Sequence, residues 1–219
     1  MSLESGGSAL ACAQAGLAFR PGLRYLTASI STAPKFWKSW KAMSNTAAAP
    51  AADAPQLPTS PQQLLARLDA LGIAYQNHSH AAVFTVEEAK ALRGALTGGH
   101  IKNLFLRNKK EEMWLVVAEE DKRIDLKALG ERLGAGKLSF GSPDRLLRYL
   151  GVLPGAVTPF GIINDQDRKV QVVLDRDLMG FNPLNAHPLV NTMTTALAPQ
   201  DLVRFLEAEG HPPTIADIG

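Results

Sequence analysis

A lysine inside the pattern of an apolar strand is the first candidate for chemistry. Residues 100–110, HIKNLFLRNKK, predict a β-strand followed by a charged turn, and Lys102 and Asn103 interrupt its apolar run. Because alternate strand residues point to opposite faces, Lys102 shares the face of Leu104 and Leu106, while Asn103 points the other way. One interpretation is a lysine that lays its stem on the core and its ammonium at the rim. The other is a cation at the floor of a pocket, for a phosphate or a polarised carbonyl.

A polar segment near the C-terminus is the second candidate. Residues 185–195, NAHPLVNTMTT, gather hydrogen-bonding side chains without any charged residue, among them His187, Asn191 and Thr194. Pro188 restricts His187 to an extended conformation. The segment is either a polar loop that leads into an edge strand or a binding wall in which His187 orients a polar substrate.

The third candidate is the segment from Gly155 to Pro159, GAVTP, where a glycine would permit close approach of the backbone to a ligand or would merely turn the chain. Metal binding has little support, because His78 and His80 lie two residues apart without a matching acid or histidine pair. The sequence has no phosphate-binding glycine-rich motif and no nucleophile elbow. We therefore expect no metal and no cofactor.

Composition limits the class of protein. The 219 residues have the apolar and charged content of an ordinary soluble domain. No apolar run approaches the roughly 18 residues that a membrane-spanning helix needs, so no membrane partner is expected. The single cysteine, Cys12, lies in the unusual N-terminal segment. This excludes a disulfide framework, a zinc ribbon and a cysteine nucleophile from the remainder.

Charge is unevenly placed along the chain. Before residue 59, five basic and two acidic residues give a balance of +3, and from residue 59 onward 18 basic and 19 acidic residues give −1, which sum to +2. The main domain is therefore not a general basic nucleic-acid binder, and a DNA partner is not expected. If it binds RNA, a local patch should grip a small part of it.

The first 58 residues differ from the rest. Residues 1–43 are rich in Ala, Ser and Gly, and residues 44–58 form an Ala/Pro linker. The upstream part is either a remnant before a natural start at Met43, which we favour, an organelle transit peptide, or a functional tail. We expect residues 1–58 to be a disordered extension and residues 59–219 to form one domain.

The domain mixes helices with hairpins. Ser60-Pro61-Gln62-Gln63 predicts a capped helix start. Apolar periodicity predicts further helices at 85–93, 126–133, 142–150 and 199–209, with a turn or helix at 175–180. Strands are predicted at 73–77, 101–107, 112–118, 157–163, 169–175, 192–197 and 214–218, with hairpins at 101–118 and 157–175. The fold class is α+β with a mixed sheet.

Several stretches together resemble a known family, the freestanding prolyl-tRNA editing proteins. These are relatives of the YbaK-type aminoacyl-tRNA deacylases and of the editing insertion in bacterial prolyl-tRNA synthetases. The matching stretches are HSHAAVFTVEEA (78–89), GGHIKNLFLRNKK (98–110), MWLVVA (113–118), residues 124–151, PGAVTPFGIIND (154–165), VVLD (172–175) and HPLVNTMTT (187–195). The resemblance covers residues 60–219 and is greatest to the branch that hydrolyses alanine mischarged on proline tRNA.

The resemblance implies a fold and a site. The fold would be a partly barrel-like mixed sheet surrounded by helices. Lys102 matches the lysine required for deacylation, with Asn103 beside it, and His187 matches the histidine that helps to form the small side-chain pocket. Gly155 to Pro159 matches a GxxxP loop at the substrate, and Asn191 and Thr194 fall in the pocket segment. The sequence departs from the family at residues 81–82, Ala-Ala, where a proline usually follows the histidine matched by His80.

The implied activity is hydrolysis of the ester of Ala-tRNA(Pro) in trans. An aminoacyl ester is activated, so positioning of water and stabilisation of the oxyanion matter more than a strong base. Lys102 would anchor the acceptor end, while the backbone near Gly155 and the terminal adenosine's own hydroxyl position the water. The expected partners are the acceptor end of mischarged tRNA(Pro) and prolyl-tRNA synthetase, in the cytoplasm unless residues 1–42 direct the chain to an organelle. A deacylase for serine, cysteine or threonine and a non-catalytic tRNA- or synthetase-binding module stay open as alternatives.

Overall fold

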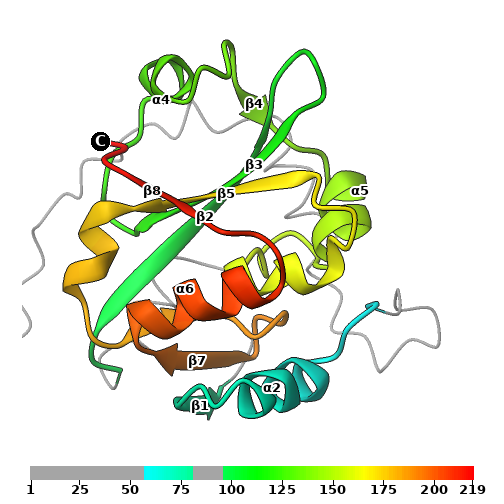
Figure 1. Cartoon of the computed structure of the whole chain (residues 1–219), viewed down its shortest axis with the longest axis vertical. Coiled ribbons are helices and arrows are strands. Elements are labelled where there is room, and N and C mark those ends of the chain that lie inside the picture. Colours follow the sequence, from blue (N-terminus) through cyan, green and yellow to red (C-terminus); the bar gives the residue numbers. More distant parts are fainter. Residues whose placement is uncertain (1–56, 81–95) are drawn as a thin grey trace, which may run out of the picture. The chain divides into compact units, whose positions relative to one another are not determined.

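An antiparallel hairpin forms the centre of the sheet in the computed structural model, which describes residues 57–80 and 96–219 (Figure 1). Strand β2 (Gly99–Arg107) pairs with β3 (Met113–Glu119), from Ile101 opposite Glu119 to Arg107 opposite Met113. Asn108 closes the turn, because its side-chain oxygen accepts hydrogen bonds from the backbone N–H groups of Lys110 and Glu112 at 2.9 and 3.1 Å. The predicted hairpin is confirmed.

Parallel and antiparallel neighbours extend this hairpin on both sides. Next to β3 lie β5 (Val170–Asp175) and β8 (Thr214–Ala216), both added in parallel. Next to β2 lie β6 (Leu184–Ala186), which is parallel to it, and then the antiparallel strands β7 (Met193–Leu197) and β1 (Tyr75–Ser79). The order is β1-β7-β6-β2-β3-β5-β8, with the two-residue strand β4 (Ser139–Phe140) on the end of β2. The expected mixed sheet is confirmed.

Two apolar cores cover the two faces of the sheet. On one face, helices α2 (Pro61–Ala70) and α6 (Pro199–Ala208) pack with short helical segments, and Phe160 meets Phe205 edge to face at 5.3 Å. On the other face, α4 (Leu126–Arg132) buries Leu129 against Leu106 and Trp114. Figure 1 shows α6 and α2 at one end of the molecule and α4 at the other. Among the described residues, no helix is long and apolar enough to cross a membrane.

One predicted strand is wrong. Residues 157–163 do not form a strand, because Pro159–Asn164 is a 3₁₀-helix, η2. Thr158 caps it by accepting a hydrogen bond from the N–H of Phe160 at 3.3 Å, and Pro159 occupies the first helical position, where its missing N–H costs nothing. The hairpin expected at 157–175 is therefore absent, and β5 pairs with β3 instead.

The remaining predictions hold with shifted bounds. Strand β1 begins two residues later than predicted, at Tyr75. The helix predicted at 142–150 is a short helix, α5 (Pro143–Arg145), continued by a π-helical turn, η1 (Leu146–Leu150). A 3₁₀-helix, η3 (Arg176–Gly180), occupies the predicted turn after β5. The sequence pattern did not predict β4 or β6, and the helix expected at 85–93 lies outside the described residues.

Candidate functional site

The register of β2 and β6 places Lys102 and His187 on the same face of the sheet. The two strands are parallel, with Gly99 opposite Leu184 and His100 opposite Asn185. Leu184 and Ala186 point into the core with α2 and α6, so side-chain alternation turns Asn185 and His187 to the other face. The same alternation turns Lys102 to that face. Lys102 and His187 each lie two residues beyond the last paired residues, where the two strands separate.

Strands β7 and β1 add more polar groups to this face. Nδ1 of His187 lies 2.9 Å from the carbonyl oxygen of Met193, which fixes the ring to the start of β7. The ring of His187 lies 6.3 Å from the ring of His80, centroid to centroid. Nε2 of His80 is 2.9 Å from the hydroxyl of Thr194, which is buried. The structure therefore brings His187, Thr194 and His80 together, while Asn191 is half-buried in the turn that precedes β7.

Lys102 is held by the turn between β3 and α4. Its ammonium donates hydrogen bonds to the carbonyl oxygen of Glu120, at 2.9 Å, and to that of Lys122. The side chain is half-buried, next to Leu104 on the face that packs against α4. An ammonium has three N–H donors, and within residues 57–80 and 96–219 only these two acceptors bond it. The geometry agrees with the first interpretation of this lysine, because its stem lies on apolar surface and its ammonium bonds to backbone carbonyls. The interpretation as a cation at the floor of a pocket stays a prediction.

Asn103 connects β2 to the loop that contains Gly155. Its amide donates to the carbonyl oxygen of Val157 at 2.9 Å, and its side-chain oxygen is buried without a hydrogen-bond partner among the described residues. Gly155 has a φ of +90° and open space where a side chain would lie, whereas Pro159 is buried at the start of η2. The loop is thus anchored at Pro159 and exposed at Gly155. No hydrogen bond in residues 57–80 and 96–219 joins Lys102 or His187 to this loop.

A gap in the sheet lies between these groups. On the edge away from β3, β2 pairs with β6 at Gly99 and His100 and with β4 at Leu106 and Arg107. Between these pairs, residues 101–105 have no strand partner on that edge in the described part of the chain. Lys102 and Asn103 both lie in this part of β2, which has no strand on that edge among the described residues.

The sequence matches the family "Aminoacyl-tRNA editing domain" over residues 80–205, more than half of the chain. The chain belongs to the aminoacyl-tRNA editing domain family. Two relatives agree with this assignment. "Prolyl-tRNA editing protein ProX" of Acetoanaerobium sticklandii is 42% identical over 151 residues, which are 68% of this chain and 92% of that protein. "Prolyl-tRNA synthetase associated domain-containing protein 1" of Mus musculus is 39% identical over 158 residues, 70% of this chain and 93% of that protein.

Solved structures share the fold of this editing domain. The crystal structure of "a putative trans-editing enzyme for prolyl tRNA synthetase" covers 75% of this chain and 100% of that one, with a TM-score of 0.57 and 23% identity. The crystal structure of "hypothetical protein APE2540" covers 69% of this chain and 97% of that one, with a TM-score of 0.56 and 20% identity. Both support the α+β architecture with a mixed sheet.

Two contacts of the candidate site were not predicted from the sequence. The acceptors of Lys102 are backbone carbonyls in the charged run Glu119–Arg123, whose side chains suggest only a solvated turn. The contact of His80 with Thr194 joins residues 114 positions apart, which only the pairing of β1 with β7 brings together. The described residues contain no group of three or more His, Cys, Asp or Glu side chains that could hold a metal ion.

Proposed function

We propose that this editing domain hydrolyses the ester of Ala-tRNA(Pro) in trans, releasing alanine and free tRNA. The observation that supports the proposal is that side-chain alternation along β2, and along β6 continued one residue past its end, puts Lys102 and His187 on one face of the sheet. A lysine ammonium bonded to two backbone carbonyls and a hydrogen-bonded histidine ring on the same face would suit an anionic RNA terminus that carries a small side chain. The printed names of the relatives, which refer to prolyl-tRNA editing and to prolyl-tRNA synthetase, support the same substrate class.

The reaction needs an attacking water, a place for the oxyanion and a good leaving group. Water adds to the ester carbonyl, the tetrahedral intermediate collapses, and the ribose oxygen leaves with a proton. The third N–H of Lys102 would hold the terminal phosphate or the developing oxyanion, because such donors act strongly where water is excluded. Asn103 and the Gly155 loop lie on the face of β2 opposite Lys102, so the proposed substrate would reach them across the open edge of β2. There the backbone at Gly155 and the neighbouring ribose hydroxyl would position the water.

Selection of alanine over proline would depend on size. A pocket built for proline rejects a smaller side chain by only about 10–200-fold for each missing methylene, so a synthetase benefits from a second, smaller sieve. In the proposed sieve, His187 and Thr194 form the wall, because both are fixed by hydrogen bonds and neither can move aside freely. Asn191 would border the same pocket from the turn, whereas Pro159 is buried at the start of η2, on the side of Asn103.

The alternatives differ in measurable ways. A deacylase for serine, cysteine or threonine would use the same chemistry with a different wall. A non-catalytic binding module would shift the mobility of tRNA in a gel but would not hydrolyse any aminoacyl-tRNA. The contact of Thr194 with His80 gives the wall a hydroxyl group, which is the observation that keeps hydroxylated side chains as the second candidate.

The test is deacylation of tRNA(Pro) charged with alanine, proline or serine. The wild type should release alanine and spare proline. Lys102→Ala should lower the rate by about 10²–10³-fold, the usual cost of removing one oxyanion donor. Lys127→Ala, an exposed lysine on α4, is the matched control and should leave the rate unchanged. Release of serine alone would favour the second candidate, and tRNA binding without turnover on any substrate would overturn the proposal.

A further inference from the structure

The turn that holds Lys102 is itself held by a second lysine. Lys122 supplies one of the two carbonyl oxygens that accept from the Lys102 ammonium. Its own ammonium reaches the opposite side, to Asp175 at the end of β5 and Asp177 in η3, each at 2.8 Å. Asp217, in the C-terminal segment, lies 3.7 Å from the same nitrogen. Lys122 therefore has two sets of contacts. Its carbonyl bonds the Lys102 ammonium, and its side chain contacts β5, η3 and the C-terminal segment.

The ion pair that anchors the turn, between Lys122 and Asp175, is largely buried. The Asp175 side chain has no solvent exposure, and that of Lys122 is only 17% exposed. The hydrogen bonds that the Lys122 ammonium donates to the carboxylates of Asp175 and Asp177 raise the pKa of Lys122 well above its ordinary value, so this lysine stays charged at neutral pH. Backbone bonds tie the same turn at two further points, from the N–H of Glu120 to His100 and from the N–H of Lys122 to Glu119. The turn thus has a fixed position relative to β2.

We propose that Lys122 is a positioning residue that fixes the Lys102 ammonium through the carbonyl groups of the Glu120–Lys122 turn. This rests on the proposed function, in which Lys102 acts at the acceptor end. A lysine stem has four rotatable bonds, so without fixed acceptors its ammonium samples many positions. Loss of the anchor would leave Lys102 present but misplaced, which lowers the rate of reaction more than it lowers binding.

The first arm of the test compares deacylation by wild type, Lys122→Met, Lys122→Arg and the control Lys127→Met. The expected result for Lys122→Met is a roughly 10–100-fold fall in kcat with a KM near that of wild type, since small misplacements of reacting groups have effects of that size. Lys122→Arg keeps the charge and should recover part of the rate. Lys127→Met, an exposed lysine on α4, should match wild type.

A double variant separates positioning from stability. Lys122→Met alone leaves Asp175 charged, buried and unpaired, which destabilises the fold. Lys122→Met combined with Asp175→Asn removes that charge and should recover the unfolding midpoint. If Lys122 positions Lys102, kcat stays low in the double variant although stability returns. Recovery of wild-type kcat together with stability would overturn the inference.

A direct measurement on Lys102 makes the result independent of turnover. Limiting acetic anhydride acylates the neutral amine of a lysine with loss of acetate, so the rate at each site depends on exposure and on how readily its ammonium releases a proton. Mass spectrometry then measures the label at each lysine. Lys102 should label several-fold faster in Lys122→Met than in wild type, with exposed Lys127 as the internal reference. Unchanged labelling would overturn the positioning role, even if kcat falls. Absence of wild-type deacylation on every charged tRNA would end the proposed function instead, and the labelling result would still decide how Lys102 is held.

Discussion

His187 is the residue whose replacement should change selectivity rather than rate. Its ring is fixed by the carbonyl oxygen of Met193 and by contact with His80, so it behaves as a rigid wall. His187→Ala removes that wall, and a larger side chain should then fit. We expect the rate of Pro-tRNA(Pro) hydrolysis to rise by roughly tenfold or more, because pocket size gives discrimination of that order. The rate of Ala-tRNA(Pro) hydrolysis should fall by a smaller factor than this rise.

The measurement is the ratio of the alanine and proline deacylation rates for each variant. Thr192→Ala is a suitable control, because Thr192 is an exposed side chain in the same segment. A variant that lost alanine activity and still spared proline would show that His187 does not limit size.

At the scale of elements, the junction of β2 with β6 controls the geometry of the site. Gly99 is paired with Leu184 at this junction, and its N–H donates to the carbonyl oxygen of Pro183 at 2.9 Å. A Cβ atom on Gly99 would lie 2.5 Å from Cγ of Phe181, so Gly99→Ala must push Phe181 and the start of β6 away from β2. We expect a loss of about 1–3 kcal/mol in the free energy of unfolding, the usual cost of overpacking. Deacylation should fall as well, since the same shift separates His187 from Lys102.

Gly180→Ala provides the matched control for this substitution. Gly180 ends η3 close to the same strand in sequence, and a Cβ atom there meets nothing within 4 Å. Chemical denaturation and the alanine deacylation rate should both remain near wild type. If Gly99→Ala also retained full activity at its lower stability, the β2–β6 junction would not set the site geometry.

The elements also show how far local patterns reach. The β2–β3 hairpin and the capped start of α2 were predicted because their signals are local: alternation with a short turn, and Ser60 with Gln63 in a reciprocal cap. Strand β6 was not predicted, because three residues flanked by proline and histidine carry no period and depend on pairing with β2 and β7. The strand predicted at 157–163 failed because apolar and β-branched residues look the same in a buried 3₁₀-helix.

The candidate site also has features that the sequence predicts and features that depend on the fold. Lys102 and His187 stood out as single residues whose types conflict with their surroundings, and a resemblance gave them roles. Their shared face depends on the register of two strands 85 positions apart in sequence, which the sequence pattern does not supply. The carbonyl acceptors of Lys102 could not be predicted at all, because every residue has a carbonyl group and only the fold selects two of them.

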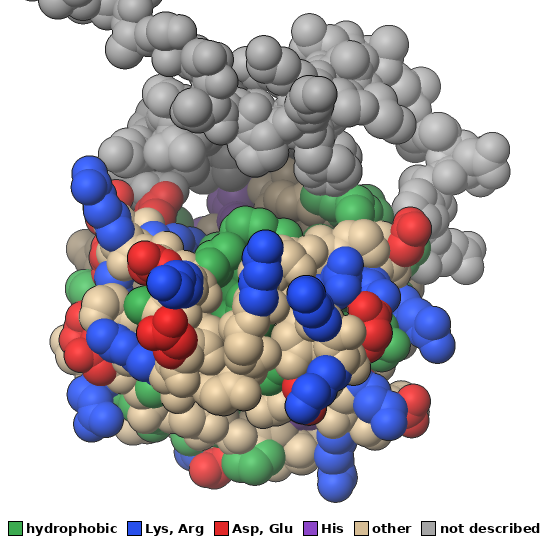
Figure 2. Space-filling model, turned by 90° about the horizontal axis from the view of Figure 1, so that it is seen from above, with side chains coloured by type: hydrophobic (Ala, Val, Ile, Leu, Met, Phe, Trp, Pro, Cys, Tyr) green, Lys and Arg blue, Asp and Glu red, His purple; other side chains and the backbone are tan. Residues whose placement is uncertain are grey.

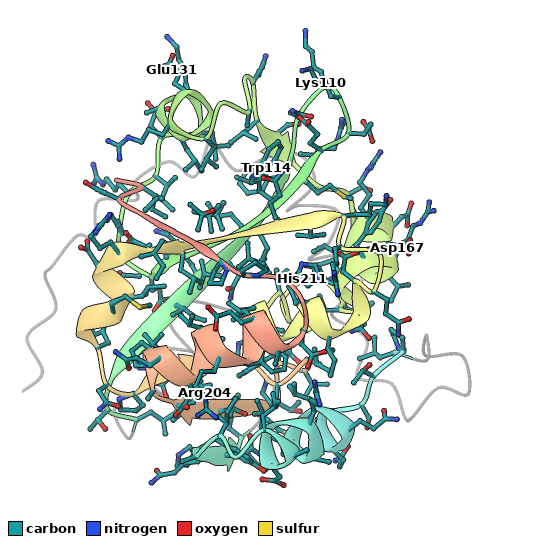
Figure 3. All side chains as sticks on the ribbon, in the orientation of Figure 1. Lys110, Trp114, Glu131, Asp167, Arg204 and His211 are labelled. Atoms are coloured by element: carbon teal, nitrogen blue, oxygen red, sulfur yellow. The ribbon has the colours of Figure 1, made fainter. Side chains whose placement is uncertain are left out.

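At the scale of the whole molecule, the net charge is small and basic side chains gather in local patches. The chain carries a formal net charge of only +2, so long-range attraction of tRNA must come from a patch. Figure 2 shows Lys and Arg side chains standing out around the face seen from above. This face includes the tip of the β2–β3 hairpin, where Lys110 points away from the body of the molecule (Figure 3). Arg107 and Arg145 form ion pairs with Glu111, whereas within the described ranges no ion pair involves Lys109 or Lys110.

These two lysines should contribute to tRNA affinity and not to chemistry. Between Lys102 and Arg107, where β2 ends, the strand runs about 17 Å at roughly 3.3 Å per residue, and the two lysines lie beyond that end. They would therefore contact the RNA away from the reacting ester. Lys110→Glu should raise KM for Ala-tRNA(Pro) several-fold and leave kcat unchanged. It should also reduce the slope of log affinity against log salt by about one, the effect of one lost phosphate contact. Lys169→Glu, an exposed lysine before β5, changes the net charge equally and is the control. Equal effects of both variants would mean that overall charge, and not the hairpin tip, governs binding of the tRNA.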